Sequence, residues 1–419
     1  MSLSPTREAL ERAVREREFV LHYQPKVSLS RGEVVGAEAL VRWDDGGVDG
    51  VVSPDVFLPL AEESGLLHEI TLGLLDQVVE ACTALRTIRP GPAPGRGAER
   101  RPRLSLSMNV APNDLAESVI STRIGELLGA GTIEASELQI EITESAVMGH
   151  VDAIRDDLGR LEALGIAVLM DDFGTGHSSI DRLSQLPFTA LKLDQGVVRR
   201  MGTSRRNLDV VKASISMARE LRMTSIAEGV ESAGAYDLLI ANGCEEAQGY
   251  WIARPMSFAD LAVFVARPHD FEGSELGRLH HAVVNLLHFR KCLVDAVFCG
   301  ASGRGKALDS VMDPGTGGDF SDSRVGAWYV ASAERLHAFE AFRAMEGPLR
   351  RLHAEGNALL DALRTRAGTD GIDGEGAMAA IDPQVEHLVH LMHTLERRLL
   401  AFRRQRSPRD RSSDPESHR

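Results

Sequence analysis

The chain has 419 residues, of which 43% are hydrophobic and 26% charged, and its formal net charge is −14. This length accommodates a barrel of roughly 250 residues together with a second unit. The excess of acidic residues argues against general nucleic-acid binding, because a polyanionic duplex would be repelled. The sequence shows no N-terminal signal and no long apolar span, so we expect no membrane insertion and a cytoplasmic location. The cysteines lack CxxC spacing and are expected to be free thiols: Cys82, Cys244, Cys292 and Cys299.

Eight short apolar segments recur along the first part of the chain and are predicted to be strands. Most are separated by amphipathic stretches such as 151–164 and 207–221, which have the periodicity of surface helices. This alternation is typical of an α/β protein with a TIM-like (β/α)₈ barrel. In chain order the segments are Glu18–Leu29, Gly36–Trp43, Leu104–Val110, Leu138–Glu144, Ile166–Met170, Ala190–Asp194, Ser225–Glu231 and Glu246–Tyr250.

The fifth segment is followed by two adjacent carboxylates, Asp171 and Asp172, and then by a glycine-rich turn. An unneutralised pair of acids in a partly buried place costs roughly several kcal/mol, so a divalent cation or a basic partner is expected beside it. The alternative is an Asp-rich turn with ordinary helix capping. Other predicted strands carry polar side chains that could reach the same space, because functional residues of a barrel collect at the carboxyl ends of its strands: Glu38, Asn109, Glu141, Glu144, Lys192, Asp194, Glu228, Glu231 and Gln248.

The composition also suggests how the chain is divided. We assign residues 1–268 to the barrel, 269–278 to a linker, 279–402 to a helical bundle and 403–419 to a disordered tail. Within the barrel, residues 89–103 are rich in Pro, Gly and Arg and are expected to form a surface insertion.

Eight short motifs occur along the barrel region: Tyr23–Pro25, Glu38–Trp43, Ala61–Leu66, Glu141–Ser145, Asp171–Gly176, Lys192–Asp194, Ala227–Glu231 and Gln248–Tyr250. In type and order these motifs resemble those of the EAL-domain cyclic di-GMP phosphodiesterases. The resemblance covers roughly residues 5–268. It implies a modified TIM barrel that hydrolyses one phosphodiester of cyclic di-GMP to linear pGpG with Mg²⁺ or Mn²⁺.

The resemblance implies two metal ions. Asp171 would bridge them, with Asp172 and Glu228 completing the second site. The first site would be completed by Glu38, Asn109 and Glu141. Oxygen ligands of this kind suit hard divalent cations, and two such ions can activate water and relieve charge on the phosphoryl group.

By the same resemblance, other residues would act around the metals. Lys192 would lie beside the attacking water, and Gln248 would orient that water or a metal-bound oxygen. Glu231 would contact the groups around the metals without binding a metal itself. Exposed or purely structural roles stay open for these three. Glu144 would steady the loop after the acidic pair, with helix capping as its alternative. The substrate side would contain Gln24, Leu40, Arg42 and Asp194. Departures from the family pattern are Ala111 in place of a serine and His177 in place of a tyrosine.

The C-terminal region has apolar residues at helical spacing and predicts three or four helices in a bundle. It resembles the chemoreceptor zinc-binding domain, whose site has three histidines and a cysteine. Here His288 and His353 match, but Ser323 and Leu349 stand at the other two positions. A leucine cannot bind zinc, so we expect a degenerate sensory or dimerisation bundle without tight zinc binding. A rearranged metal site and an unrelated helical appendage are the alternatives.

The leading functional hypothesis is an active cyclic di-GMP phosphodiesterase, because every implied metal position carries a residue able to act as a ligand. One alternative is a catalytically silent module that binds cyclic di-GMP and passes a signal through the bundle. Another is a metal-dependent phosphodiesterase with a different nucleotide substrate. The resemblance also implies a homodimer.

Overall fold

The computed structural model describes residues 6–46, 51–88, 103–116, 118–174, 185–267, 269, 271, 273–298, 320–365 and 374–406. Two compact units are formed, one by Met1–Leu239 with Cys244–Gly273 and the other by Ile240–Gly243 with Ser274–Arg419. His177 and most of the expected insertion and tail lie outside the described residues.

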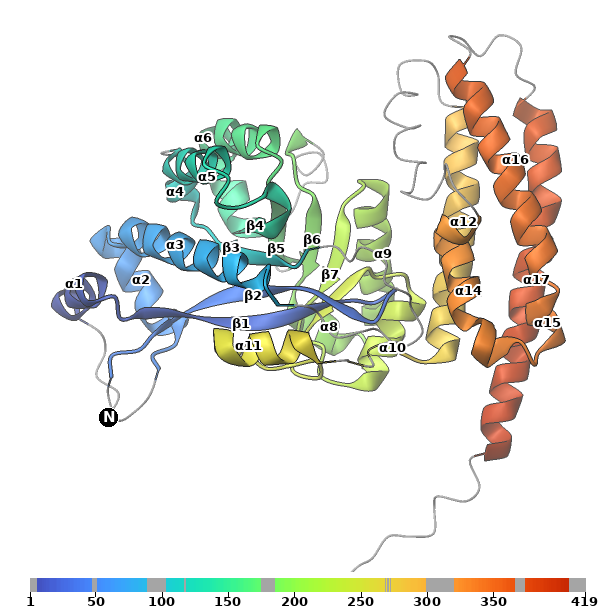
Figure 1. Ribbon diagram of the computed structural model, residues 1–419, viewed down its shortest axis with the longest axis horizontal. Coiled ribbons are helices and arrows are strands. Elements are labelled where there is room, and N and C mark those ends of the chain that lie inside the picture. Colours follow the sequence, from blue (N-terminus) through green and yellow to red (C-terminus); the bar gives the residue numbers. More distant parts are fainter. Residues whose placement is uncertain are drawn as a thin grey trace, which may run out of the picture. The chain divides into compact units, whose positions relative to one another are not determined.

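The first unit is a closed barrel whose eight strands follow one another in chain order (Figure 1). The TIM-like barrel predicted from the sequence is therefore confirmed. The strands are β1 (Phe19–Ser28), β2 (Glu33–Trp43), β3 (Ser105–Asn109), β4 (Leu138–Thr143), β5 (Ala167–Phe173), β6 (Ala190–Leu193), β7 (Thr224–Ala227) and β8 (Glu246–Gln248).

The first strand of this barrel runs against its neighbours. β1 pairs antiparallel with both β2 and β8, whereas the other adjacent pairs are parallel. The cause lies in the connection between β1 and β2, which consists only of residues 29–32. A parallel pair needs a crossover of about a dozen residues or more, so this short turn permits only a hairpin.

Helices lie around the outside of the barrel, as the alternation of segments predicted (Figure 1). The predicted amphipathic stretches fall in α6 and α9. In the described residues the helical elements of this unit are α1 (Arg7–Glu16), α2 (Pro54–Ser64), α3 (Leu67–Leu85), α4 (Pro112–Ala116), α5 (Val119–Gly129), η1 (Ala135–Glu137), α6 (Glu144–Ala163), α8 (Gln195–Arg200), α9 (Arg205–Glu220), α10 (Ala233–Ala241) and α11 (Phe258–Ala266).

The second unit is an all-α bundle, which confirms the predicted class of the C-terminal region. Its elements are α12 (Glu275–Phe298), η2 (Phe320–Asp322), α14 (Arg324–Leu336), α15 (Glu340–Arg343), α16 (Glu346–Thr365) and α17 (Gly374–Arg406). Buried side chains from these helices form one apolar core, in which the rings of Tyr329 and Phe342 stack with centroids 4.4 Å apart. α12 begins within the segment expected to be a linker, and α17 extends into the segment expected to be a tail.

A buried ion pair holds the turn that leads into β4. The Glu137 carboxylate, 1% exposed, accepts hydrogen bonds from Arg86 Nε at 2.7 Å, from Arg103 Nη1 at 2.8 Å and from the Glu134 backbone N–H at 2.9 Å. Burial alone would raise the pKa of Glu137, but Arg86, the Glu134 amide and Arg103 outweigh it and lower the pKa to about 2. The ionised carboxylate therefore stabilises the folded barrel.

Replacing Glu137 by Gln should lower the free energy of unfolding at neutral pH by about 1.5–3 kcal/mol, because hydrogen bonds to a charged group are lost. A lowered native pKa contributes stability above the unfolded-state pKa of about 4.3 and loses it as the pH falls toward about 2. The difference between wild type and Glu137→Gln should thus shrink with acidification. Urea unfolding at about pH 7 and about pH 3.5 measures it. A constant difference would contradict the assignment, and Glu63→Gln, at an exposed carboxylate on α2, is the control.

Candidate active site

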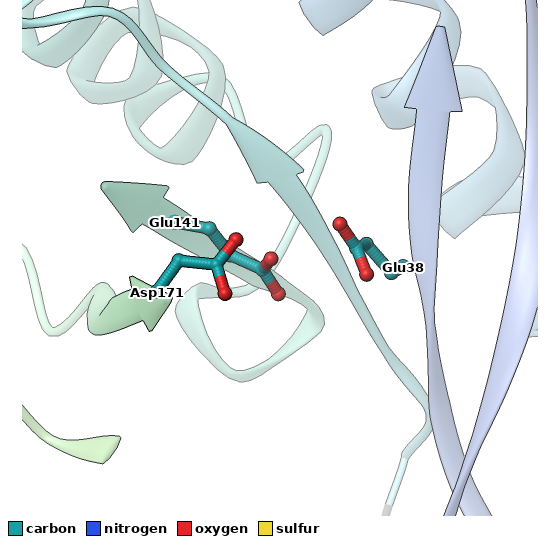
Figure 2. A group of neighbouring side chains, drawn as sticks. All are labelled: Glu38, Glu141 and Asp171. Carbon is teal, nitrogen blue, oxygen red and sulfur yellow. The ribbon is translucent and has the colours of Figure 1, made fainter. Parts of the chain in front are cut away.

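Two groups of carboxylates meet at the carboxyl ends of the barrel strands. In the first, one oxygen from each of Glu38, Glu141 and Asp171 lies within 4.8 Å of the other two, and all three residues are buried. Figure 2 shows these side chains converging from β2, β4 and β5. In the second group, Asp171, Asp172 and Glu228 meet the same distance condition. Asp171 belongs to both groups, as expected for a residue placed between two cations.

Strand pairing explains why residues so distant in sequence meet here. In the parallel ladder, Asn109 is the register partner of Glu141, and Thr143 is the register partner of Asp171. Gln24 is the register partner of Glu38 in the antiparallel pair of β1 and β2. Side chains alternate between the two faces of a strand, so polar residues at these positions enter the barrel mouth while their neighbours pack outside.

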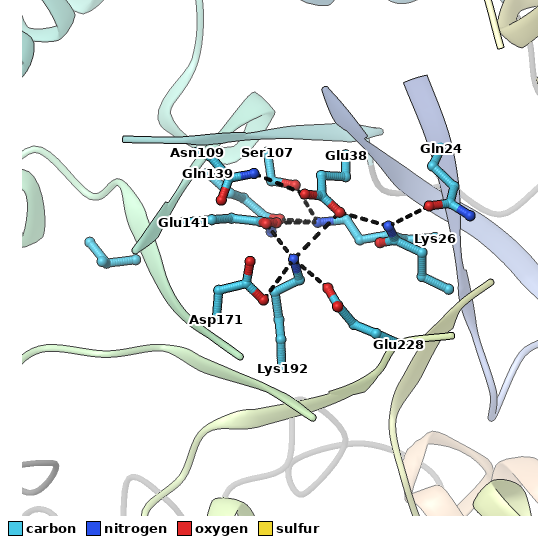
Figure 3. Close-up of polar contacts among 12 residues, drawn as sticks. Gln24, Lys26, Glu38, Ser107, Asn109, Gln139, Glu141, Asp171, Lys192 and Glu228 are labelled. Atoms are coloured by element: carbon cyan, nitrogen blue, oxygen red, sulfur yellow. Dashed lines mark hydrogen bonds and ion pairs between the residues drawn. The ribbon is translucent and has the colours of Figure 1, made fainter. Parts of the chain in front are cut away.

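The Lys192 ammonium lies among four of the carboxylates (Figure 3). Its Nζ is 2.6 Å from Glu228 Oε1, 3.2 Å from Asp171 Oδ1 and 3.4 Å from Glu38 Oε2. It also donates a hydrogen bond to Glu141 Oε2. Lys192 has no exposed surface, so the charge is wholly enclosed by protein. The oxygens of this cluster are therefore arranged to surround a positive charge.

The donors also fit hard divalent cations. Carboxylate and amide oxygens are the ligands that Mg²⁺ and Mn²⁺ prefer. Glu141 Oε1 is buried and has no hydrogen-bond partner among the described residues. A buried oxygen without a partner is costly for the apo protein, and a bound cation would satisfy it. These observations support a metal site in this cluster.

The cluster holds more negative charge than Lys192 balances. Burial, and next the Glu38 carboxylate, raise the pKa of Glu141 to about 7, against the effect of Lys192. Burial also raises the pKa of Glu228 well above its ordinary value, and Asp171 and Glu38 add to this. Burial acts to lower the pKa of Lys192, but the carboxylates, Glu141 first, outweigh it and raise that pKa well above its usual value. The site therefore favours additional cations.

Amide side chains orient Glu38. Gln248 Nε2 donates to Glu38 Oε2 at 2.6 Å and to Gln24 Oε1 at 3.0 Å, and Asn109 Nδ2 donates to Glu38 Oε1 at 2.9 Å. Burial would raise the pKa of Glu38, but Lys192, Gln248 and Asn109 outweigh it, so the pKa is lowered. Glu38 is thus held as a carboxylate in a fixed direction.

The acidic pair contains a local backbone distortion near the end of β5. Asp172 has φ +57°, and its N–H donates to Asp171 Oδ1 at 2.8 Å. This left-handed backbone interrupts the alternation of the strand, so both carboxylates of the pair join the second group. Burial and the neighbouring Asp171 raise the pKa of Asp172. Glu144 Oε2 accepts from the Gly174 N–H at 3.0 Å and so links Gly174, two residues beyond the pair, to the start of α6.

Comparison with known proteins identifies the barrel. The family model described as "EAL domain" matches residues 7–255. The chain belongs to the EAL domain family. The cyclic di-GMP phosphodiesterase NbdA of Pseudomonas aeruginosa is 35% identical over 267 residues, which are 64% of this chain and 32% of NbdA. RocR, a cyclic di-GMP phosphodiesterase of the same organism, is 36% identical over 239 residues, covering 57% of this chain and 58% of RocR.

A solved structure of the PaMucR phosphodiesterase in complex with c-di-GMP covers 61% of this chain and 98% of that chain, with 33% identity and a TM-score of 0.54. The chain spans about a third of the length of the first curated relatives that it matches. The EAL family suggested by the sequence motifs is confirmed, and the C-terminal bundle lies beyond the family match. Within the described residues, no helix has the length and apolarity needed to cross a membrane.

Some residues assigned to the EAL site have other contacts. Asp194 caps α8, because its Oδ1 accepts from the N–H groups of Gly196 at 3.0 Å and Val197 at 3.2 Å. Glu231 pairs with Arg199 at 2.6 Å, and both side chains are about half exposed. These contacts place Asp194 at a strand end and Glu231 toward solvent.

On β2, Leu40 and Arg42 continue the face that carries Glu38 and are partly exposed. The guanidinium of Arg42 donates to the Val41 carbonyl at 2.7 Å. Burial lowers the pKa of Arg42, against the effect of Tyr250 and Glu38. Arg42 is therefore close enough to the barrel mouth to interact electrostatically with Tyr250 and Glu38.

The sequence motifs did not draw attention to Lys26, which the structure places beneath the acids. Lys26 has no exposed surface, and its Nζ donates to Gln139 Oε1 at 2.8 Å and to Ser107 Oγ at 3.0 Å. Glu141 Oε1 is 3.8 Å away. The available signal was the two-residue spacing from Gln24, which gives both side chains the same face of β1.

In the bundle, the two matching histidines have separate contacts. His288 Nε2 is 3.4 Å from Cys292 Sγ, and His353 Nδ1 is 3.4 Å from Asn357 Nδ2. Ser323 caps α14, because its hydroxyl donates to the Phe320 carbonyl and accepts from the Gly326 N–H at 3.1 Å. The groups of acidic, histidine or cysteine side chains that could hold a metal, among the described residues, both lie in the EAL barrel.

Mn²⁺ should stabilise the wild-type chain against thermal unfolding, by about 2.7 kcal/mol at one hundred times the dissociation constant. Asp171→Asn should lose most of this stabilisation, because Asp171 belongs to both groups, whereas Glu228→Gln should lose only part. Differential scanning calorimetry with and without Mn²⁺ measures the change. The exposed carboxylate of Glu126 provides a control in Glu126→Gln. An Asp171→Asn protein that responds to Mn²⁺ like wild type would refute the metal assignment.

For the bundle we predict that zinc content does not depend on His353. Full-length wild type and His353→Ala, each loaded with excess Zn²⁺ and desalted, should retain equal amounts, because Ser323 serves as a helix cap and Leu349 is apolar. Elemental analysis provides the measurement. Loss of one zinc per chain in the variant would show a rearranged site.

Proposed function

We propose that the EAL barrel is a cyclic di-GMP phosphodiesterase that hydrolyses one phosphodiester bond to give linear pGpG, with two Mg²⁺ or Mn²⁺ ions. The observation that carries this proposal is the pair of carboxylate groups that share Asp171. Two adjacent cation sites with oxygen ligands suit the hydrolysis of a phosphodiester. Relatives named as cyclic di-GMP phosphodiesterases support the choice of substrate.

The metal set would comprise Asp171 in both sites, Glu38, Asn109 and Glu141 in one, and Asp172 and Glu228 in the other. When bound, the ions would lower the pKa of water and neutralise charge on the phosphoryl oxygens. One water would add across one of the two phosphodiester linkages, so that the single macrocycle of cyclic di-GMP opens to linear pGpG and no other group is transferred.

The protein's own groups complete the chemistry. The Lys192 ammonium would stabilise the negative charge that develops on the phosphoryl group, because it is fixed by four carboxylates before substrate arrives. Gln248 would keep Glu38 in position and orient the attacking water. Glu144 would hold the residues after the acidic pair through the Gly174 amide. Glu231 would not bind a metal itself but would help to orient the groups that do.

Substrate contacts would come from the open side of the barrel. Arg42 lies on β2, and its guanidinium would contact a phosphate or a guanine edge of the nucleotide. Leu40 and Gln24 would contact the nucleotide beside it. Asp194 would contact the nucleotide through Oδ2, because its Oδ1 caps α8.

For the C-terminal bundle we propose a regulatory or dimerisation role, in a homodimer that works in the cytoplasm. Its continuous apolar core supports an independently packed unit, and the cap formed by Ser323 supports a bundle that has lost tight zinc binding. The bundle lies outside the EAL match and contributes none of the proposed catalytic residues. We therefore assign it to regulation or dimerisation and not to catalysis.

Incubation of the purified full-length chain with cyclic di-GMP and Mg²⁺ or Mn²⁺ should yield linear pGpG. Lys192→Met should lower kcat by about 10²–10³-fold, because a fixed charge at the developing oxyanion is lost, and Glu38→Ala should abolish turnover. Chromatography of the nucleotides measures both.

The rival assignment, a silent receptor, predicts a different result from the same samples. A wild-type chain that binds cyclic di-GMP by calorimetry but forms no linear product with any divalent metal would establish it. Hydrolysis of another cyclic nucleotide in preference to cyclic di-GMP would instead overturn the choice of substrate.

A further inference from the structure

Lys26 is a second buried lysine in the barrel, and the proposed chemistry does not use it. It lies on β1 with no exposed surface, between the register partners Gly36 on β2 and Gln248 on β8. An enclosed ammonium is costly unless nearby groups compensate its charge. The groups that face Lys26 therefore indicate what its charge does.

The contacts of Lys26 are mostly neutral. Two of its hydrogen bonds go to Gln139 Oε1 at 2.8 Å and Ser107 Oγ at 3.0 Å. Among the described residues, the carboxylate in ion-pair range is that of Glu141, whose Oε1 is 3.8 Å from Lys26 Nζ. Ser107 and Gln139 thus fix the ammonium so that it faces one oxygen of Glu141.

Glu141 is consequently placed between two lysines (Figure 3). Lys192 takes Oε2 through a hydrogen bond, and Lys26 faces Oε1, the oxygen without a hydrogen-bond partner among the described residues. Lys192 also contacts Glu38, Asp171 and Glu228, so its position depends on the whole cluster. Lys26 is held by two neutral partners and faces Glu141, and its charge also acts on Glu38 and on Glu246.

We propose that Lys26 is a positioning residue that fixes the Glu141 carboxylate for metal binding. This inference rests on the proposed function, because it takes Glu141 as a metal ligand. Lys26 lies deeper in the barrel than the proposed ligands, because its neighbours Gly36, Ser107 and Gln139 each precede one of those ligands by two residues. It therefore faces Glu141 from the side away from the nucleotide. Groups that orient metal ligands in this way typically contribute 10–100-fold to metal affinity or activity.

The test compares Lys26→Met with wild type in the full-length chain. Lys26→Met should weaken Mn²⁺ binding by about tenfold or more in isothermal titration calorimetry. It should lower kcat for cyclic di-GMP while KM stays within about twofold, since Lys26 does not reach substrate. Without Mn²⁺, the melting temperature should fall, because Glu141 loses a compensating charge and the buried oxygens of Gln139 and Ser107 lose their donor. A merely structural lysine would lower the melting temperature in the same way but leave the Mn²⁺ affinity of the folded protein unchanged.

Val27→Ala is the matched control, because Val27 is the next residue on β1 and is also fully buried. It should lower the melting temperature through its cavity but leave Mn²⁺ affinity unchanged. If Lys26→Met does not fold, Lys26→Gln provides the same comparison with a neutral hydrogen-bonding group. Wild-type or tighter Mn²⁺ binding in the folded variant overturns the inference. A wild type that neither binds Mn²⁺ nor hydrolyses cyclic di-GMP overturns the proposed function instead.

Discussion

The barrel mouth depends on one electrostatic constraint: several buried carboxylates share a space in which their charges must be compensated. Glu38, Glu141, Asp171 and Glu228 all contact the Lys192 ammonium, which is enclosed by them. In a medium of low dielectric constant, such a group of acids is stable only with protons or cations among them. The raised pKa of Glu141 and Glu228 expresses this excess of negative charge. The two carboxylate groups can therefore bind cations in place of protons.

The architecture of the barrel creates this constraint and also tolerates it. Glu38, Glu141 and Asp171 come from three different strands and Glu228 directly follows a fourth, and the ladder hydrogen bonds hold these strands together against the repulsion between the carboxylates. The amides of Asn109 and Gln248 bind Glu38 without adding negative charge. The reversed β1 has a further consequence, because it brings Gln24 and Lys26 to the cluster from a strand that runs in the opposite direction.

Much of this arrangement could be predicted from the chain. Apolar segments that end in acids indicated the barrel, and the motifs indicated the EAL family, which the match over residues 7–255 confirms. The reversal of β1 was not predicted, although the four residues between β1 and β2 are too few for a crossover. Lys26 was passed over because its spacing from Gln24 gives the face of β1 on which it lies but not its partners on β3 and β4.

The sequence by itself determined the type of fold, the family and the set of oxygen-bearing side chains, because periodicity and motif order are local properties of the chain. Only the tertiary structure decided how these side chains are shared. It placed Asp171 in both carboxylate groups, Glu141 between Lys26 and Lys192, Asp194 on the N-terminus of α8 and Glu231 beside Arg199. Strand register and barrel closure determine these contacts, because they bring together segments that are far apart in sequence. The local sequence pattern does not show which of these segments are close in space.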